Sequence, residues 1–291
     1  MGNREPARPD AGDTGAGFVA RAVDRWRDGQ SEQVEDWVAE EMPIAMLYNG
    51  ASFAVMMATP HDLDDFALGF SLSEGLVTEP AQLLEVETQA LLEGLQLRMR
   101  VAPQAHGAHL SNAQERLLPG RSGCGICGTR ELEQAIRQSA PVGAGSVVQR
   151  SALEQALGQL HALQPMNAAT GAIHAAAWAD LQGNILLVRE DVGRHNALDK
   201  LIGAMHRAAL DPQQGMALVT SRASYEMVTK AAAANIALLA AISAPTALAI
   251  QLARSAGMTL VGFARPGRHN VYTHPQRLLP DQLSATAPLD L

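Results

Sequence analysis

The two cysteines of this 291-residue chain lie three positions apart in one glycine-flanked hexapeptide, Gly123-Cys124-Gly125-Ile126-Cys127-Gly128. Cys-x-x-Cys spacing lets two sulfur atoms meet each other, a metal ion or a shared substrate, whereas structural cysteines usually occur singly in a core as small apolar residues. The three glycines supply backbone freedom and no side chains for packing. The hexapeptide therefore predicts thiol or metal chemistry, against the alternative of two incidental thiols in a surface loop.

Three kinds of chemistry suit this pair of thiols. A structural zinc site needs about four ligands, and no histidine has finger-like spacing to the cysteines, so a second subunit would have to complete it. A disulfide exchanger of the thioredoxin type places its pair at the start of a helix after a strand, and no such strand is predicted before Cys124. A sulfur carrier, whose thiolate accepts a sulfane sulfur as a persulfide, suits a glycine-rich loop. Arg121 and Arg130 would then favour the thiolate of Cys124, and Cys127 would release or relay the sulfur.

A second group of polar residues stands where apolar runs end in the second half of the chain. Its members are Arg194 and His195, Ser221 and Arg222, Ser243 and Thr246, and Arg265, Arg268 and His269. In an open α/β sheet, ligands gather beyond the carboxyl ends of the strands, where helix N-termini present N–H groups. Any one junction is explained by a helix cap or a solvent-facing arginine. The four junctions together predict a phosphate or pyrophosphate site.

The elements that must position these groups fall into two halves. The first half predicts two hairpins with a helix between them, at residues 44–58, 59–75 and 84–101. Asn49-Gly50 readily takes the positive backbone angles of a tight hairpin turn. Thr59 supplies a capping hydroxyl for the helix. We therefore expect a small α+β unit here.

From His174 onward, short apolar runs alternate with helical stretches. The predicted strands are residues 175–179, 185–189, 216–220, 236–242 and 259–264, with helices beginning near Asn196, Ser224 and Thr246. Ahead of them, Ser151 opens a capping box for a helix that runs through Leu160. This rhythm predicts a largely parallel sheet covered by helices.

Length and composition bound the domain organisation. A chain of 291 residues that is 47% hydrophobic can bury two cores, since single cores rarely grow much past ~250 residues. We expect a disordered tail at residues 1–17, an N-terminal α+β domain at 18–120, a mobile Cys-x-x-Cys loop and linker at 121–145, and an α/β cofactor-binding domain at 146–291. Within the linker, Thr129 would cap a helix that runs to about Gln138.

Charge and apolar patterning exclude several function classes. A formal net charge of −8 argues against a general nucleic-acid or anionic-membrane surface. Neither a secretory signal nor a membrane span is predicted, so the expected location is the cytoplasm. Two cysteines cannot form a disulfide framework.

The residues above belong to a pattern that resembles a known family, the formate dehydrogenase accessory sulfurtransferases, or FdhD proteins. The resemblance runs from about Glu41 to Arg277. It is carried by Tyr48-Asn49-Gly50, Leu68-Gly69-Phe70-Ser71-Leu72-Ser73-Glu74-Gly75, the cysteine hexapeptide, His174-Ala175-Ala176-Ala177, residues 190–200, residues 221–227 and residues 260–268.

The resemblance implies that Cys124 carries a persulfide taken from a cysteine desulfurase. It would deliver the sulfur to the molybdenum (or tungsten) bis-pyranopterin guanine dinucleotide cofactor, a bound acceptor substrate that is then inserted into the formate dehydrogenase apoenzyme. The resemblance also implies a homodimer, and cofactor contacts from Phe263-Ala264-Arg265-Pro266-Gly267-Arg268. Arg194, His195, Ser221 and Arg222 join this candidate cofactor-binding set as residues of the converging junctions. No structural metal is expected.

The fold implied is α/β, with a larger C-terminal domain of the cytidine-deaminase-like α/β/α type and a smaller N-terminal α+β domain containing hairpins. Deaminase activity is not expected, because His174 is followed by alanines where a His-x-Glu zinc signature would be needed. We interpret His174 as a packed or hydrogen-bonded histidine, and give His195 and His269 the better claims to ligand contact.

Two alternatives to sulfur transfer remain open. One is a non-catalytic cofactor chaperone, in which the junctions bind the cofactor while Cys124 and Cys127 sense redox state. The other is a dimer linked by zinc through four cysteines, two from each subunit.

Overall fold

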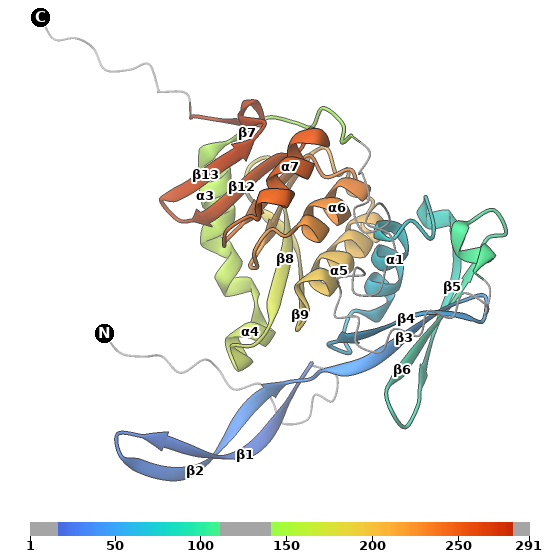
Figure 1. Ribbon diagram of the computed structural model, residues 1–291. Coiled ribbons are helices and arrows are strands. Elements are labelled where there is room, and N and C mark those ends of the chain that lie inside the picture. Colours follow the sequence, from blue (N-terminus) through green and yellow to red (C-terminus); the bar gives the residue numbers. More distant parts are fainter. Residues whose placement is uncertain (1–16, 111–140, 282–291) are drawn as a thin grey trace, which may run out of the picture.

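The computed structural model describes residues 17–110 and 141–281. The second of these ranges contains a six-stranded sheet (Figure 1). The strands of this sheet are β8 (His174–Asp180), β9 (Ile185–Asp191), β10 (Gly215–Val219), β11 (Leu238–Ala241), β12 (Thr259–Arg265) and β13 (Arg268–Thr273). Their spatial order is β13-β12-β11-β10-β8-β9. The five strands predicted in this half of the chain are confirmed, whereas the edge strand β13 and the spatial order were not predicted.

The sheet is mixed, so the prediction of a largely parallel sheet was wrong. Only the pairs β10–β11 and β11–β12 are parallel, whereas β8 is antiparallel to both neighbours and β13 is antiparallel to β12. Two apolar runs in sequence do not distinguish a helical crossover from a hairpin. Between β8 and β9 the chain reverses at Asp180, whose Oδ1 accepts hydrogen bonds from the N–H groups of Gln182 and Asn184. Arg268-His269-Asn270, expected to be loop, instead begin β13 after a tight turn.

Helices cover both faces of the sheet, which gives the expected α/β/α layering. Successive residues of a strand point to opposite faces. One face packs against α5 (Arg194–Arg207), α6 (Tyr225–Ala233) and α7 (Ala247–Ser255), and the other packs against α3 (Arg150–Leu160) (Figure 1). In β10, for example, Ala217 and Val219 join the first core, while Met216 and Leu218 join the second. Because both faces are buried, the central strands are apolar throughout.

The first half of the chain forms a four-stranded sheet with the order β4-β3-β6-β5. Its strands are β3 (Met42–Tyr48), β4 (Ala51–Ala58), β5 (Leu83–Ala90) and β6 (Leu95–Val101), so both predicted hairpins are confirmed. The helix α1 (Leu63–Ser73) packs Phe66 and Phe70 onto this sheet. On its other side it meets α5 at two glycines. A Cβ added at Gly69 would lie 1.7 Å from the carbonyl oxygen of Asp199, and one added at Gly203 would lie 2.0 Å from that of Asp65.

Two helix starts differ from their predicted caps. The residue before α1 is Asp62, in the left-handed conformation and without a side-chain cap. The Thr59 hydroxyl instead accepts a hydrogen bond from the N–H of Val192, in the other half of the chain. Ser151 lies inside α3, and its hydroxyl donates to Asp281 at 2.6 Å. Both hydroxyls make tertiary contacts, which the local sequence does not reveal.

An additional hairpin, β1 (Phe18–Arg27) and β2 (Gln30–Ala39), was not predicted from the sequence. It extends away from the rest of the molecule (Figure 1), and Trp26 near its tip is 71% exposed. Its turn is Asp28-Gly29, both with positive φ, the dipeptide that favours a two-residue hairpin. The sequence therefore did contain a signal for it.

Short elements complete the described structure. They are β7 (Val148–Gln149), α4 (Pro165–Thr170), β14 (Leu278–Leu279), and the 3-10 helices Pro80–Gln82, His106–His109, His161–Leu163 and Pro275–Arg277. The chain re-enters the described part at residue 141, where Arg277 donates hydrogen bonds to the carbonyl oxygens of Gly143 and Ala144.

Several predictions fall outside the described residues. These are the tail before residue 17, the hexapeptide with Cys124 and Cys127, and the helix expected after Thr129. The domain boundaries likewise stay predictions.

Candidate functional site

The predicted junctions meet at one edge of the six-stranded sheet. Strands β10, β11 and β12 are parallel, and β9 runs in the same direction because β8 is antiparallel to both β9 and β10. His174 pairs with Asp191 in register, and the N–H of Thr220 donates to the carbonyl oxygen of Ala175, one residue along β8. The carboxyl ends of β9 to β12 therefore share this edge, as the sequence predicted.

Asp191 holds the turn that presents Arg194 and His195. Its Oδ1 accepts hydrogen bonds from the N–H of Gly193 at 2.7 Å and from the side-chain nitrogen of Asn196 at 3.0 Å. Gly193 is the N-cap of α5, so Arg194 and His195 open the helix. N–H groups in a first helical turn have no intrahelical partner. The turn thus places a guanidinium and an imidazole beside peptide donors.

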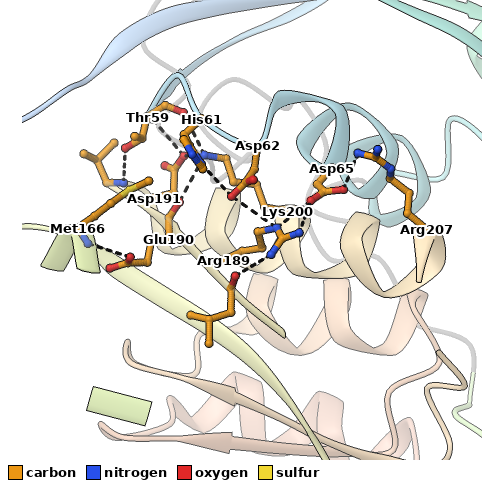
Figure 2. Close-up of polar contacts among 12 residues, drawn as sticks. Thr59, His61, Asp62, Asp65, Met166, Arg189, Glu190, Asp191, Lys200 and Arg207 are labelled. Atoms are coloured by element: carbon orange, nitrogen blue, oxygen red, sulfur yellow. Dashed lines mark hydrogen bonds and ion pairs between the residues drawn. The ribbon is translucent and has the colours of Figure 1, made fainter. Parts of the chain in front are cut away.

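A buried lysine supports the same aspartate from the helix interior. Lys200 Nζ lies 2.7 Å from Asp191 Oδ2, and neither side chain is exposed (Figure 2). Lys200 also donates to the carbonyl oxygen of Thr59 at 3.0 Å, while Asp191 Oδ2 accepts from the N–H of Thr59. Because Thr59 lies just before α1, this ion pair joins the two halves of the chain beneath the site.

Other charged groups around this turn are also structural. Glu190 accepts hydrogen bonds from the N–H groups of Met166 and Asn167 at the start of α4, and burial raises its pKa in spite of them. Arg189 lies 2.7 Å from Asp65 and 3.5 Å from Asp62 on the α1 side (Figure 2). These acids and Arg189 therefore connect elements, and the groups available for a ligand lie further along at Arg194 and His195.

At the starts of α5 and α6, three buried polar atoms have no hydrogen-bond partner within the described residues. They are Arg194 Nε, His195 Nε2 and Ser224 Oγ. The His195 side chain is only 7% exposed, and its Nε2 lies 3.8 Å from a carboxylate oxygen of Glu226 in the first turn of α6, too far for a hydrogen bond. Ser224 is the N-cap of α6 but makes no side-chain cap hydrogen bond. Buried polar atoms usually have partners, so these three mark the part of the edge that can accept a ligand.

His174 belongs to the same cluster, which the sequence interpretation missed. It is half-buried, and its pKa is lowered by burial and by the positive charges of Arg194 and His195. His174 reaches this cluster because it pairs with Asp191 in the antiparallel β8–β9 hairpin, a register that the local sequence does not reveal. We therefore add His174 to the candidate site residues.

Ser221 and Arg222 lie between β10 and α6, at the centre of the edge. The buried Ser221 hydroxyl donates to the carbonyl oxygen of Arg222, and the Arg222 side chain is exposed. A ligand at the edge can therefore reach Arg222 from solvent, whereas the Ser221 hydroxyl is engaged locally.

The turn after β12 displays an aromatic ring. Phe263 is 41% exposed and has a φ of 51°, within an irregularity of the ladder between Gly262 and Arg265. Its N–H donates to the carbonyl oxygen of Ser243 at 3.1 Å. A left-handed backbone at a bulky residue is uncommon and costs on the order of 1–3 kcal/mol, so such residues are enriched at ligand sites. Phe263 is thus held as an exposed platform at the edge.

A groove of about 930 Å³ lies between α3 and β13, beyond Phe263 along the chain. The groove is lined by Arg150, Glu154, Gly267, Arg268, His269, Asn270, Val271 and Tyr272. Glu154 accepts a hydrogen bond from the N–H of Gly267 at 2.6 Å and lies 3.5 Å from His269 Nδ1. The helix therefore fixes the turn that carries Arg268.

The candidate cofactor-binding residues thus form two groups along one edge. Arg194 and His195 open α5, with His195 facing α6, whereas Gly267 and Arg268 line the groove beside α3. Strands β8, β10 and β11 separate β9 from β12, and four strand spacings amount to about 19 Å. A ligand that used both groups would have to be extended.

Residues 17–110 and 141–281 contain no cluster of three or more His, Cys, Asp or Glu side chains suited to a metal ion. Among those same residues, none of the helices combines the length and the apolar character needed to span a membrane.

Comparison with known proteins places the chain in a family. Residues 39–279 match the model of the FdhD/NarQ family. The chain is 58% identical over 262 residues to the sulfur carrier protein FdhD of Xanthomonas euvesicatoria pv. vesicatoria, covering 90% of this chain and 92% of that protein. It is 52% identical over 257 residues to the sulfur carrier protein FdhD of Cupriavidus necator, covering 88% of each.

A solved structure has the same fold. The crystal structure of a Desulfotalea psychrophila protein, described as a formate dehydrogenase accessory protein, superposes with a TM-score of 0.73 at 23% identity. The match covers 90% of this chain and all of that one. From the family match over most of its length and its identity to the curated relatives, the chain belongs to the FdhD/NarQ family.

Proposed function

We propose that this chain is a sulfurtransferase, which carries sulfur to the molybdenum (or tungsten) bis-pyranopterin guanine dinucleotide cofactor and so supports formate dehydrogenase activity. The observation that carries this proposal is the 58% identity to a curated sulfur carrier over nine-tenths of the chain. The chain's entire supply of thiols, Cys124 and Cys127, lies in one Cys-x-x-Cys hexapeptide. Cys124 is the proposed persulfide carrier, and Cys127 assists it.

The sheet edge supports the acceptor half of this proposal. Arg194 and His195 at one end, Arg222 at the centre and Arg268 at the other end offer donors for phosphate oxygens, which guanidinium groups bind through charge-assisted hydrogen bonds. Phe263 offers a ring on which a base can stack. A cofactor that reaches both groups would extend along the edge from Arg194 to Arg268.

The proposed partners are a cysteine desulfurase as sulfur donor, the formate dehydrogenase apoenzyme as recipient and a second copy of this chain, in the cytoplasm. For the larger domain, whose strand order is β13-β12-β11-β10-β8-β9, we propose the cytidine-deaminase-like α/β/α type.

Maturation of formate dehydrogenase tests the function. In cells that lack the native gene, the wild-type chain should restore enzyme activity, and Cys124→Ala should abolish it while the protein stays folded. Retained maturation in the Cys124→Ala, Cys127→Ala double variant would instead select the non-catalytic cofactor chaperone. Stoichiometric zinc in the purified wild-type protein, lost in that variant, would select the zinc-linked dimer.

Nucleotide binding tests the proposed cofactor edge separately. Arg268→Ala should weaken binding of guanosine diphosphate by about tenfold, because it removes a charge-assisted hydrogen bond. Arg254→Ala is the matched control, since Arg254 is an exposed arginine near the C-terminal end of α7, at the opposite edge of the sheet. Equal affinities for the wild type and Arg268→Ala would move the nucleotide away from β13.

A further inference from the structure

We propose that the N-termini of α5 and α6 form a buried site for one phosphate-class oxyanion, distinct from the groove between α3 and β13. The proposal rests on the proposed function only for the source of the phosphate. Its own basis is the set of donors that this part of the edge leaves without partners.

Two adjacent helix starts supply those donors. Arg194 and His195 open α5, and Ser224 is the N-cap of α6. The positive end of each helix dipole and the N–H groups of the first turn favour an anion. Both helices have at least two turns, and the His195 ring bridges them by extending to the first turn of α6.

Unsatisfied side-chain atoms distinguish this place from an ordinary helix start. Arg194 Nε, His195 Nε2 and Ser224 Oγ are buried and have no hydrogen-bond partner within residues 17–110 and 141–281. The His195 side chain is more than nine-tenths buried. Leaving a buried donor unpaired costs about 1–3 kcal/mol, so three such atoms at the starts of α5 and α6 favour a ligand that satisfies them together. One tetrahedral oxyanion has enough acceptor oxygens to do so.

The surrounding charges define what kind of anion fits. Asp191 is already neutralised by Lys200 and saturated by hydrogen bonds. A carboxylate oxygen of Glu226 lies 3.8 Å from His195 Nε2. With this carboxylate present, the cluster has only a modest positive charge, so recognition depends on directed hydrogen bonds. A phosphate group provides several strong acceptors in a compact volume.

Ser224→Ala is the sharpest variant for testing the site. Because the Ser224 hydroxyl makes no cap hydrogen bond, removing it should leave the melting temperature of the free protein unchanged or higher. The same change should weaken phosphate binding at least fivefold. A purely structural serine would not separate these two readouts.

Calorimetric titration of the full-length protein with inorganic phosphate, at constant ionic strength, measures the effect. Arg194→Gln should weaken binding at least tenfold, and Glu226→Gln should strengthen it by removing a nearby negative charge. Arg254→Gln, at the opposite edge, should leave phosphate affinity within twofold of wild type. Unchanged affinity in both Ser224→Ala and Arg194→Gln overturns the proposal, as does an equal loss in Arg254→Gln.

Competition identifies the source of the phosphate. Displacement of inorganic phosphate by guanosine diphosphate, but not by guanosine, assigns the site to a nucleotide phosphate. If phosphate binds as predicted but is not displaced, the site takes the free anion. Persulfide loading of Cys124 is a separate measurement, so absence of phosphate binding with intact loading would refute this site and leave the sulfur carrier standing.

Discussion

Replacement of Lys200 should lower the stability of the fold strongly, because it leaves the buried carboxylate of Asp191 without its counter-charge. Replacement by methionine keeps the length of the side chain and removes the charge that lies 2.7 Å from Asp191. Both partners are fully buried, and removing one member of such a pair costs about 3–5 kcal/mol. That cost is a large share of the total stability of about 5–15 kcal/mol of a typical protein.

Arg207→Met is the matched control. Arg207 also lies on α5 and pairs with an acid of α1, Asp65, at 3.0 Å, but its side chain is 54% exposed. Exposed pairs contribute about 0–1 kcal/mol, so this variant should lose far less stability. Urea unfolding at pH 7, followed by far-ultraviolet circular dichroism and tryptophan fluorescence, gives both values.

A double-mutant cycle separates the ion pair from general disruption. Lys200→Met and Asp191→Asn should each destabilise the protein, and together they should cost at least about 1 kcal/mol less than the sum, since residues in direct contact are coupled. Additive costs, or a Lys200→Met cost no larger than that of Arg207→Met, would refute the interpretation of this pair as the link between the two halves.

Two further predictions concern packing and pH. Gly69→Ala should lower the free energy of unfolding by about 3 kcal/mol or more, because its Cβ would lie 1.7 Å from the carbonyl oxygen of Asp199. Gly158→Ala, with open space on the exposed face of α3, should instead raise it by about 0.5–1 kcal/mol. Thermal unfolding of both variants checks this, and a mild effect at Gly69 would contradict the close α1–α5 contact. The lowered pKa of His174 means that the unfolded chain binds this proton more readily, so stability should fall as the pH drops below the ordinary histidine value of 6.5 until the folded pKa is reached. His174→Gln should reduce this fall between pH 7.5 and 5.5, and an unchanged pH dependence would contradict the predicted environment of His174.

Much of the architecture could be predicted because local patterns determine it. Asn49-Gly50 predicts a hairpin turn whatever surrounds it, and strands buried on both faces are apolar in any mixed or parallel sheet. The same is true of the polar junctions, since the ends of same-direction strands meet at one edge. Asp28-Gly29 predicts the first hairpin equally well, but the segments on either side of it are rich in charged residues and do not show an apolar strand pattern.

Other features depend on contacts between residues far apart in sequence. Thr59 and Ser151 have the right chemistry for helix caps, yet their hydroxyls contact Val192 and Asp281 instead. The direction of β8 depends on a turn that its apolar run does not encode. The division of the candidate cofactor-binding residues into two groups follows from the position of β12, which three strands separate from β9.

The mass of Cys124 after exposure to a sulfur donor tests the central claim most directly. The full-length protein is incubated with an active cysteine desulfurase and cysteine, and its peptides are then analysed by mass spectrometry without reductant. The account predicts one added sulfur atom on the peptide that contains Cys124, removed by reductant and absent from the Cys124→Ala variant. An active desulfurase that leaves no sulfane sulfur on Cys124 would contradict it.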